Sequence, residues 1–185
     1  AADGGEIELV GENGMLRLNV PPTVTRANIA IAEGSEIDVA ADGGGDIAVQ
    51  ANTLDVTGGS LLNAGIFPGF GFPDAQAGDI RLEATGSVTI SDSPIFNQVG
   101  VADETAPLAI GNSGNIEIEA EQIAVRGFDS IVAARTFGEG NAGNVALRAL
   151  EAIQIDGSAV FAGVGFNGIG NSGNIDMEAG EIAVR

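Results

Sequence analysis

The chain contains no histidine, cysteine, lysine, tryptophan or tyrosine among its 185 residues. It therefore cannot form a Ser-His-Asp or Cys-His catalytic group, a thiolate or imidazole metal site, a Schiff base or a disulfide. A phosphate-binding glycine-rich loop would lack its lysine. Carboxylates and arginines are the ionisable side chains that remain near neutral pH, so any catalysis would have to be carboxylate chemistry.

Basic charge is also scarce. Seven arginines stand against 26 acidic residues, which gives a net charge of −19. Such a surface repels nucleic acid and anionic membranes, and we expect neither as a partner. The sequence has no run of 18 apolar residues, so we expect no membrane span.

What the sequence does contain is a recurring block of Gly, then Asp or Asn, then an alternating apolar stretch that ends in Ala. The differences between the numbers of successive opening glycines are 33, 36, 29 and 30 residues. A near-regular period of this length is typical of stacked similar units rather than of one globular core. The opening glycines are Gly45, Gly78, Gly114, Gly143 and Gly173.

Each unit divides into a constant half and an elastic half. From the opening glycine to Ser60, Ser93, Ser130 and Ser158 the segments measure 15, 15, 16 and 15 residues, whereas the remainders measure 18, 21, 13 and 15. Paired strands do not tolerate insertions, because a slip of one residue turns the apolar face outward, but surface loops do. The constant half is therefore expected to be scaffold and the elastic half to contain a loop.

The constant half reads as two short strands. In one copy Ile116 and Ile118 alternate with Glu117 and Glu119, and a second alternating strand follows around residues 123–125. A third, weaker strand is expected in the elastic half, as at residues 131–135. Helices are disfavoured by the period of two and by the 29 glycines. We predict an all-β, right-handed parallel β-helix, a solenoid of about five to six coils of roughly 30 residues with three short strands per coil.

Stacking predicts columns of equivalent residues about 4.8 Å apart. On the outer surface Arg81 should lie beside Glu117. Arg148 should lie between Glu119 and Glu178. At the corner before the first strand a polar column is expected, in which the asparagines could form an amide ladder: Asp46, Asp79, Asn115, Asn144 and Asn174.

The coils are expected to occupy residues 41–185, with starts near the five glycines. Residues 1–40 are less regular, because Pro21-Pro22 interrupts their alternating segments, and are predicted to be irregular opening coils or a junction to an upstream region. The last alternating segment ends at Arg185, one strand short of a full coil, so we expect a segment of a longer solenoid.

One carboxylate group deserves consideration as a site. Some β-helices cleave polysaccharides with carboxylates, and Glu83, Glu117 and Glu119 could cluster beside Arg81. Alternating acidic residues are also what any solvated strand face displays, so we assign no catalytic, cofactor-binding or metal-ligating residue and predict that the chain is not an enzyme. Residues 42–46, Asp-Gly-Gly-Gly-Asp, resemble part of a calcium-binding β-roll turn, but this turn occurs once; no cofactor is predicted, with calcium as an alternative.

Seven of the eight phenylalanines lie in the elastic segments, three of them in an apolar stretch at residues 61–77 that we predict to be a loop. These phenylalanines could form a surface for a partner. They could also fold back over the flank of the helix, which we favour. The eighth, Phe128, lies in the 16-residue copy, where the extra residue predicts a bulge.

Several blocks resemble a known family: residues 74–80, Ala133-Ala134-Arg135-Thr136-Phe137-Gly138, and Gly140-Asn141-Ala142-Gly143-Asn144. They are similar to the filamentous-haemagglutinin-like exoproteins of Gram-negative bacteria, which are exported by two-partner secretion. The similarity covers most of residues 28–185 and depends on the order and spacing of the blocks. It implies a right-handed β-helix that is secreted or held at the outer cell surface and serves as an adhesin. The family's Asn-Pro-Asn secretion motif is not in these residues, and the resemblance carries over no functional residue.

The sequence thus predicts a non-catalytic structural or adhesive shaft segment of a large secreted or cell-surface exoprotein, whose partner would be an extracellular glycan or protein receptor. Two alternatives stay open. One is a carbohydrate-binding or polysaccharide-cleaving β-helix. The other is a fibre subunit that associates end to end through the unpaired strand edges of its terminal coils.

Overall fold

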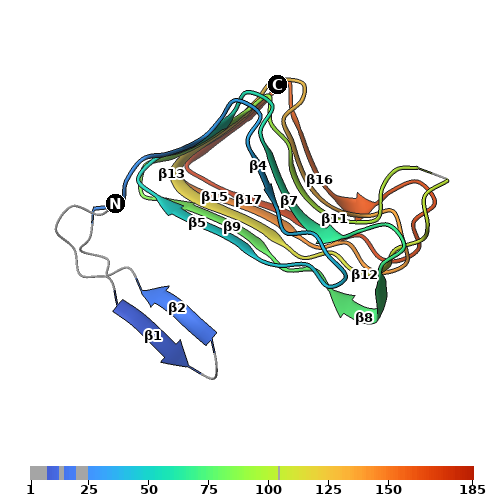
Figure 1. The fold of residues 1–185 in the computed structure, drawn as a ribbon. Coiled ribbons are helices and arrows are strands. Elements are labelled where there is room, and N and C mark those ends of the chain that lie inside the picture. The colour runs from blue at the N-terminus through green and yellow to red at the C-terminus, as the bar shows by residue number, and fades with distance from the viewer. Residues whose placement is uncertain (1–7, 13–14, 20–24, 104) are drawn as a thin grey trace.

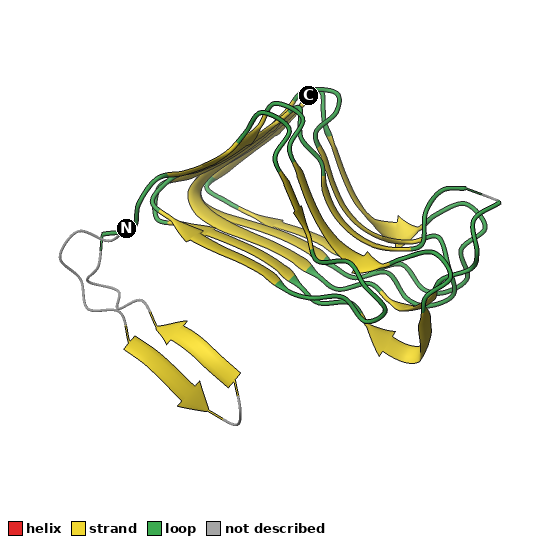
Figure 2. Cartoon of the chain, viewed as in Figure 1, coloured by secondary structure: helices red, strands yellow, loops and turns green. Residues whose placement is uncertain are grey.

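The structure is a computed structural model that describes residues 8–12, 15–19, 25–103 and 105–185. Every element in these residues is a β-strand (Figure 2). From residue 29 onward the strands wind into coils that lie over one another (Figure 1) and pair in parallel with their equivalents in neighbouring coils. The predicted parallel β-helix is therefore confirmed. Four coils are complete and a partial coil lies at each end, slightly fewer than the five to six predicted.

Each coil has three sides, and the strands of each side form a ladder. The first side comprises β5 (Ile47–Ala51), β9 (Ile80–Ala84), the first halves of β13 (Ile116–Arg126) and β15 (Val145–Asp156), and β17 (Ile175–Glu178). The second side comprises β3 (Ile29–Ile31), β6 (Leu54–Thr57), β10 (Ser87–Ser91), the second halves of β13 and β15, and β18 (Glu181–Val184). The third side comprises β4 (Glu36–Asp38), β7 (Leu61–Ile66), β11 (Ile95–Val99), β14 (Ile131–Thr136) and β16 (Ala159–Val164).

Equivalent residues of successive coils lie side by side. Ile116 pairs with Ile80 in the coil before it and with Val145 in the coil after it. All three side chains are fully buried, whereas Glu117 and Glu119 on the alternate positions reach solvent. Burying an aliphatic side chain of this size stabilises the fold by about 1.5–3 kcal/mol. The alternation seen in the sequence therefore produces a continuous apolar interior along the solenoid.

The opening glycine of each repeat is required by the distance between coils. A Cβ atom added to Gly143 would clash with the carbonyl oxygen of Gly114, and Gly114 and Gly173 stand in the same relation to the opening glycines before them. An added Cβ on Gly78 would clash likewise with the backbone of Gly45. Glycine recurs here because the backbones of adjacent coils approach too closely for any side chain.

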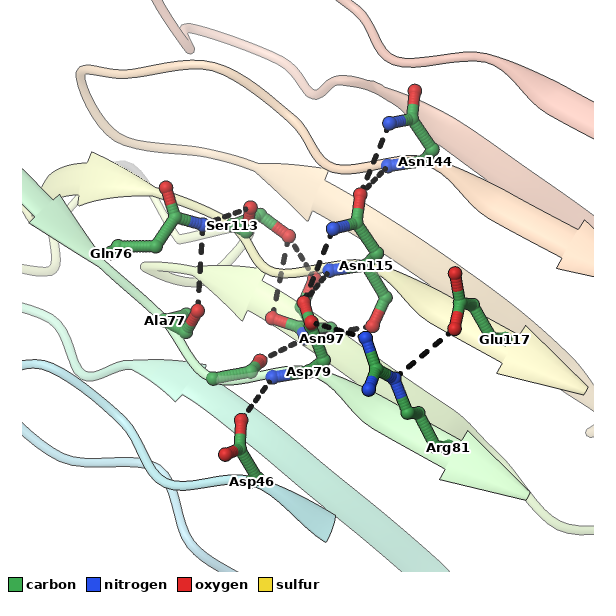
Figure 3. Close-up of polar contacts among 11 residues, drawn as sticks. Asp46, Gln76, Ala77, Asp79, Arg81, Asn97, Ser113, Asn115, Glu117 and Asn144 are labelled. Carbon is green, nitrogen blue, oxygen red and sulfur yellow. Dashed lines mark hydrogen bonds and ion pairs between the residues drawn. The ribbon is translucent and has the colours of Figure 1, made fainter. Parts of the chain in front are cut away.

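The predicted polar column is confirmed and forms a hydrogen-bonded ladder (Figure 3). In each step a backbone amide donates to the side-chain oxygen of the preceding coil: Asp79 N to Asp46 Oδ1 at 2.7 Å, Asn115 N to Asp79 Oδ1 at 2.8 Å, and Asn144 N to Asn115 Oδ1 at 3.0 Å. The next coil continues the ladder, with Asn174 N donating to Asn144 Oδ1 at 2.9 Å. The Asn144 side-chain amide also donates to Asn115 Oδ1, at 3.1 Å. The ladder satisfies one backbone amide per coil at the corner.

This ladder offers a matched pair of substitutions. Asn115→Ala removes a side-chain oxygen that accepts two hydrogen bonds and a side-chain amide that donates one. We therefore expect it to lower the free energy of unfolding by about 1–2 kcal/mol. Asn174→Ala, in the last coil, removes a side chain that makes no hydrogen bond with the described residues, and should change it by less than about 0.5 kcal/mol. Urea denaturation of both variants measures the difference. Equal losses would mean that the ladder does not contribute to stability.

The elastic segments are more ordered than predicted. Residues 61–77 are not a loop: they contain β7 and β8 (Gly71–Gln76), and β8 pairs in parallel with β12 (Ile110–Asn112). Isolated bridges continue this line from Ile110 to Glu139 and from Glu139 to Ile169. This extra ladder coincides with a second Gly-Asn repeat, which lies three residues before the first one in each copy: Gly111-Asn112, Gly140-Asn141 and Gly170-Asn171.

The stretch predicted as irregular opening coils or a junction, residues 1–40, contains coil strands near its end, because β3 and β4 pair with β6 and β7. Near the start of the chain, β1 (Glu8–Glu12) and β2 (Met15–Asn19) pair as two antiparallel strands, and Pro21-Pro22 lies outside the described residues. The bulge predicted at Phe128 was wrong: the extra residues extend the turn after β13, and the register shift lies between Ala120 and Gln122.

In the described part of the chain, no helix exists that is long and apolar enough to span a membrane.

Candidate binding faces

A groove of about 830 Å³ runs across the coils where the first side meets the second. Its floor is a column of small residues, because the strands bend sharply there and the equivalent positions hold alanine. Its walls carry charged side chains of both signs. The floor consists of Ala84, Ala120, Ala149 and Ala179, and the charged walls of Arg26, Glu83, Glu119, Glu121, Arg148 and Glu178.

Of the three carboxylates considered as a site, two line this groove and one lies outside it. Glu83 and Glu119 are neighbours in the ladder and line it. Glu117 lies outside it and pairs with Arg81 at 3.1 Å, as predicted (Figure 3). Arg148 lies between Glu119 and Glu178 in the ladder, as predicted. Its guanidinium contacts Glu119 at 3.7 Å and, diagonally, Asp176 at 3.5 Å. Long side chains reach diagonally across a ladder, and the sequence columns do not capture this.

Glu83 and Glu119, the two candidate carboxylates in the groove, have similar surroundings. Arg26 lies 3.5 Å from Glu83, which also accepts a hydrogen bond from the Gln50 amide at 2.8 Å. Glu119 pairs with Arg148, and the two glutamate side chains are 38% and 55% exposed. An acid–base pair needs two carboxyl groups whose environments differ, and here both are exposed and ion-paired. The arrangement neutralises charge along a strand face and could hold a polar ligand.

The acidic residues of the calcium-like turn bind backbone instead. Asp42 accepts a hydrogen bond from Gly71 N at 2.6 Å, and Asp46 accepts the one from Asp79 N. Both carboxylates thereby join adjacent coils. Across the described ranges, no three acidic residues lie close enough together to hold a metal ion.

A different cluster, which we call the Phe–Arg cluster, lies on the outer face of the third side: Phe96, Phe137, Phe161 and Arg135. The centre of the Arg135 guanidinium lies 5.6 Å, 5.1 Å and 5.3 Å from the three ring centroids, in the order given. Guanidinium groups at these distances are attracted to the ring faces. Three coils contribute to the cluster, because Phe96 is on β11, Arg135 on β14 and Phe161 on β16.

The ladder explains how the rings come together. Phe96 and Phe161 are both register partners of Ala133, which is fully buried although it is absent from the inner core. The two rings therefore cover Ala133 from the coils on either side. Phe137 lies against Gly165, where an added Cβ would clash with its ring. Partial burial among the rings lowers the pKa of Arg135 from its usual value by desolvation. Arginine side chains are effectively always protonated in proteins, so the group is treated as a cation.

This face is unusual in its charge. The strands β7, β11, β14 and β16 contain no acidic residue, although the chain holds 26. Arg81 and Arg148 pair with carboxylates on the first side, whereas the Arg135 side chain makes no ion pair or hydrogen bond with any residue that the structure describes. Its Nε is buried without a partner. These four strands thus present a cation in an otherwise neutral and partly aromatic surface, and the acidic residues of the third side, Glu36 and Asp38, lie on β4 at its other end.

Apolar residues extend the surface beyond the cluster. Phe137 also lines a cleft of about 250 Å³ with Val101, Asp103, Leu108 and Asn167. Phe166 is 72% exposed nearby, and Phe67, Phe70 and Phe72 are 40–55% exposed. The expectation that these last three fold back over the solenoid was therefore wrong. These phenylalanines flank a turn at Pro68-Gly69 that leads the chain from β7 to β8: Phe67 precedes the turn, and Phe70 and Phe72 come after it.

Sequence reasoning missed the Phe–Arg cluster. Its signal is present in the outward positions of three third-side strands, since Phe96, Ala133 and Phe161 share one column and Arg135 stands two residues further on. Recognising it requires the third strand to be aligned between coils, and that strand carries the weakest repeat.

The fold and its faces define a parallel β-solenoid that carries an acid-free aromatic face and a charged groove on different sides. No known protein family, no curated protein and no solved structure matches the chain.

Proposed function

We propose that the chain is a non-catalytic structural or adhesive shaft segment of a large secreted or cell-surface exoprotein. The observation that supports this most is the unbroken pairing of equivalent strands from coil to coil on all three sides. Parallel ladders of this kind resist bending and hold whatever projects from them at fixed intervals. The partly exposed phenylalanines project from such positions.

The chemistry of the side chains supports a binding role over a catalytic one. The ionisable groups are carboxylates and arginines, and the carboxylates best placed in a groove, Glu83 and Glu119, are ion-paired with Arg26 and Arg148. An apolar surface with few charges is the kind that meets partners. The residues with this character are on the third side and the edge next to it.

A binding screen with a parallel activity assay tests the proposal. The purified chain is applied to a panel of immobilised glycans and extracellular proteins, and the same glycans are incubated with it in solution. We expect binding to at least one surface without release of reducing ends or unsaturated sugars. Release of sugars that is lost in Glu83→Gln or Glu119→Gln, but kept in Glu117→Gln, would replace the proposal with a polysaccharide-cleaving enzyme. Binding to no surface would contradict the adhesive role.

Self-association is a second candidate, favoured by the exposed edge of the last strands. Ile182 is 45% exposed and Val184 67%, whereas their partners Ile153 and Ile155 are buried. Sedimentation velocity over a range of concentrations tests this candidate. A larger species that Val184→Glu abolishes would support it, and a monomer at high concentration would contradict it.

A further inference from the structure

We propose that the Phe–Arg cluster is a binding site for a sugar residue that carries a single carboxylate, such as a uronic acid at the end of an otherwise neutral glycan. The inference rests on the proposed adhesive function and assigns a ligand class to one face of the shaft. It is drawn from the position of Arg135, the aromatic rings around it and the charge of the surface.

The guanidinium is held in place before any ligand arrives. Rings from two neighbouring coils and from Phe137 on its own coil hold it at 5.1–5.6 Å, and its Nε is buried without a hydrogen-bond partner. Little side-chain freedom is then left to lose on binding, which favours affinity. A guanidinium also offers a planar fork of donors that matches the two oxygens of a carboxylate.

The cation is available because no carboxylate of the protein occupies it. Arg81 and Arg148 show the usual outcome in so acidic a chain, since each contacts two acidic side chains. Arg135 has none within the described residues, and its four-strand face has no acidic residue to compete with a ligand. An incoming carboxylate therefore displaces nothing but water.

The aromatic rings select the body of the ligand. Phe161 is 43% exposed beside Arg135 and offers an aromatic surface next to the cation. A pyranose ring has a face of C–H groups that can lie on an aromatic ring, while its carboxylate projects from the edge. A carboxylated sugar thus meets a ring and a cation at once, and a neutral sugar meets the ring alone.

The charge of the whole protein restricts the ligand to few negative charges. With −19 on the chain, a strand of nucleic acid or a densely charged polymer would be repelled along most of its length. The described part of the cluster holds one arginine, which can neutralise one carboxylate. The ligand should therefore be an isolated acidic sugar and not a polyanion.

Binding of two matched disaccharides tests the site directly. One ends in glucuronic acid and the other in glucose, and both are titrated against the full chain by calorimetry or by NMR shifts. We expect the acidic disaccharide to bind at least about tenfold more tightly than the neutral one. Arg135→Gln should remove this preference, and Arg135→Lys should keep only part of it, because lysine lacks the fork. Phe161→Ala should weaken both sugars.

Arg126→Gln serves as the matched control, because it removes an exposed arginine from the second side, outside both the groove and the Phe–Arg cluster. It should leave sugar binding unchanged. Circular dichroism and thermal unfolding establish that each variant folds; if Arg135→Gln does not fold, Arg135→Lys and Phe161→Ala still decide the outcome. Equal binding of the two disaccharides, undiminished binding by Arg135→Gln, or absence of binding by the acidic disaccharide would each overturn the inference. Tighter binding of single-stranded DNA or of an acidic peptide would also overturn it.

Failure here is distinguishable from failure of the shaft proposal. If the chain binds surfaces of the glycan and protein panel but Arg135→Gln binds them equally, the adhesive function stands and the ligand class is wrong. If the wild-type chain binds neither the panel nor the disaccharides, both fail together.

Discussion

Replacing Gly143 by alanine should lower the free energy of unfolding by about 3 kcal/mol or more, an effect at the upper end for the addition of one methyl group. The new Cβ would meet the carbonyl oxygen of Gly114 and also approach the backbone of Ser113. Neither can move aside, because both belong to a coil that is hydrogen-bonded on both of its edges. The cost is steric, since the φ angle of Gly143 is not in the left-handed region.

Gly43→Ala is the matched control. Its added Cβ would have no atom within 4 Å, and its φ angle is also outside the left-handed region. We expect a change within about 0.5 kcal/mol, with slight stabilisation because alanine restricts the unfolded chain. Urea denaturation monitored by circular dichroism compares the two variants. Similar midpoints would show that coils at residues 114 and 143 are not in close backbone contact.

Asn97→Ala should be almost as damaging, with a loss of about 3 kcal/mol. Asn97 is fully buried on β11 and points across the interior to the corner of the first side. Its Nδ2 donates to the Gly78 carbonyl at 2.7 Å, and its Oδ1 accepts from Gly114 N at 3.0 Å (Figure 3). Alanine would leave both backbone groups buried without these partners and would also leave a void.

Asn63→Ala is the corresponding control on the third side. Asn63 lies on β7 in the column of Phe96, faces outward, and donates to Asp38 at 3.1 Å in a solvent-exposed hydrogen bond. Its loss should change the free energy of unfolding by less than about 1 kcal/mol. Equal destabilisation of the two variants in thermal unfolding would contradict a special role for Asn97.

The first and second sides could be predicted from the sequence in detail. Their apolar residues alternate without error, and their corner carries a glycine that sterics demand and an Asx residue that joins the coils. Those requirements repeat in every coil, so they leave a visible pattern. The pairing of Arg81 with Glu117 could be predicted for the same reason.

The third side and the elastic segments were predicted less well, because their interactions do not repeat. Asn97 stands in a column whose other members are Ala64, Ala134 and Ala162, so its role belongs to one coil. The Phe–Arg cluster likewise depends on side chains of three different coils. The strand β8 in residues 71–76 pairs with a single strand, and it has Ala75-Gln76 where the later coils of its ladder have the recurring Gly-Asn pair. Contacts that occur once need coordinates to be found.

Disulfide formation between engineered cysteines tests the stacking of the coils most directly, and the absence of natural cysteine leaves no competing thiol. Ala124 pairs with Gln154 in the next coil, whereas Thr89 lies one coil before Ala124 and two coils from Gln154. Neighbouring positions of a parallel ladder are within disulfide range, and positions two coils apart are not. Under mild oxidation the Ala124→Cys/Gln154→Cys variant should form an intramolecular disulfide and the Thr89→Cys/Gln154→Cys variant should not. Cross-linking of the second pair in place of the first would contradict the stacked solenoid and every function proposed for it.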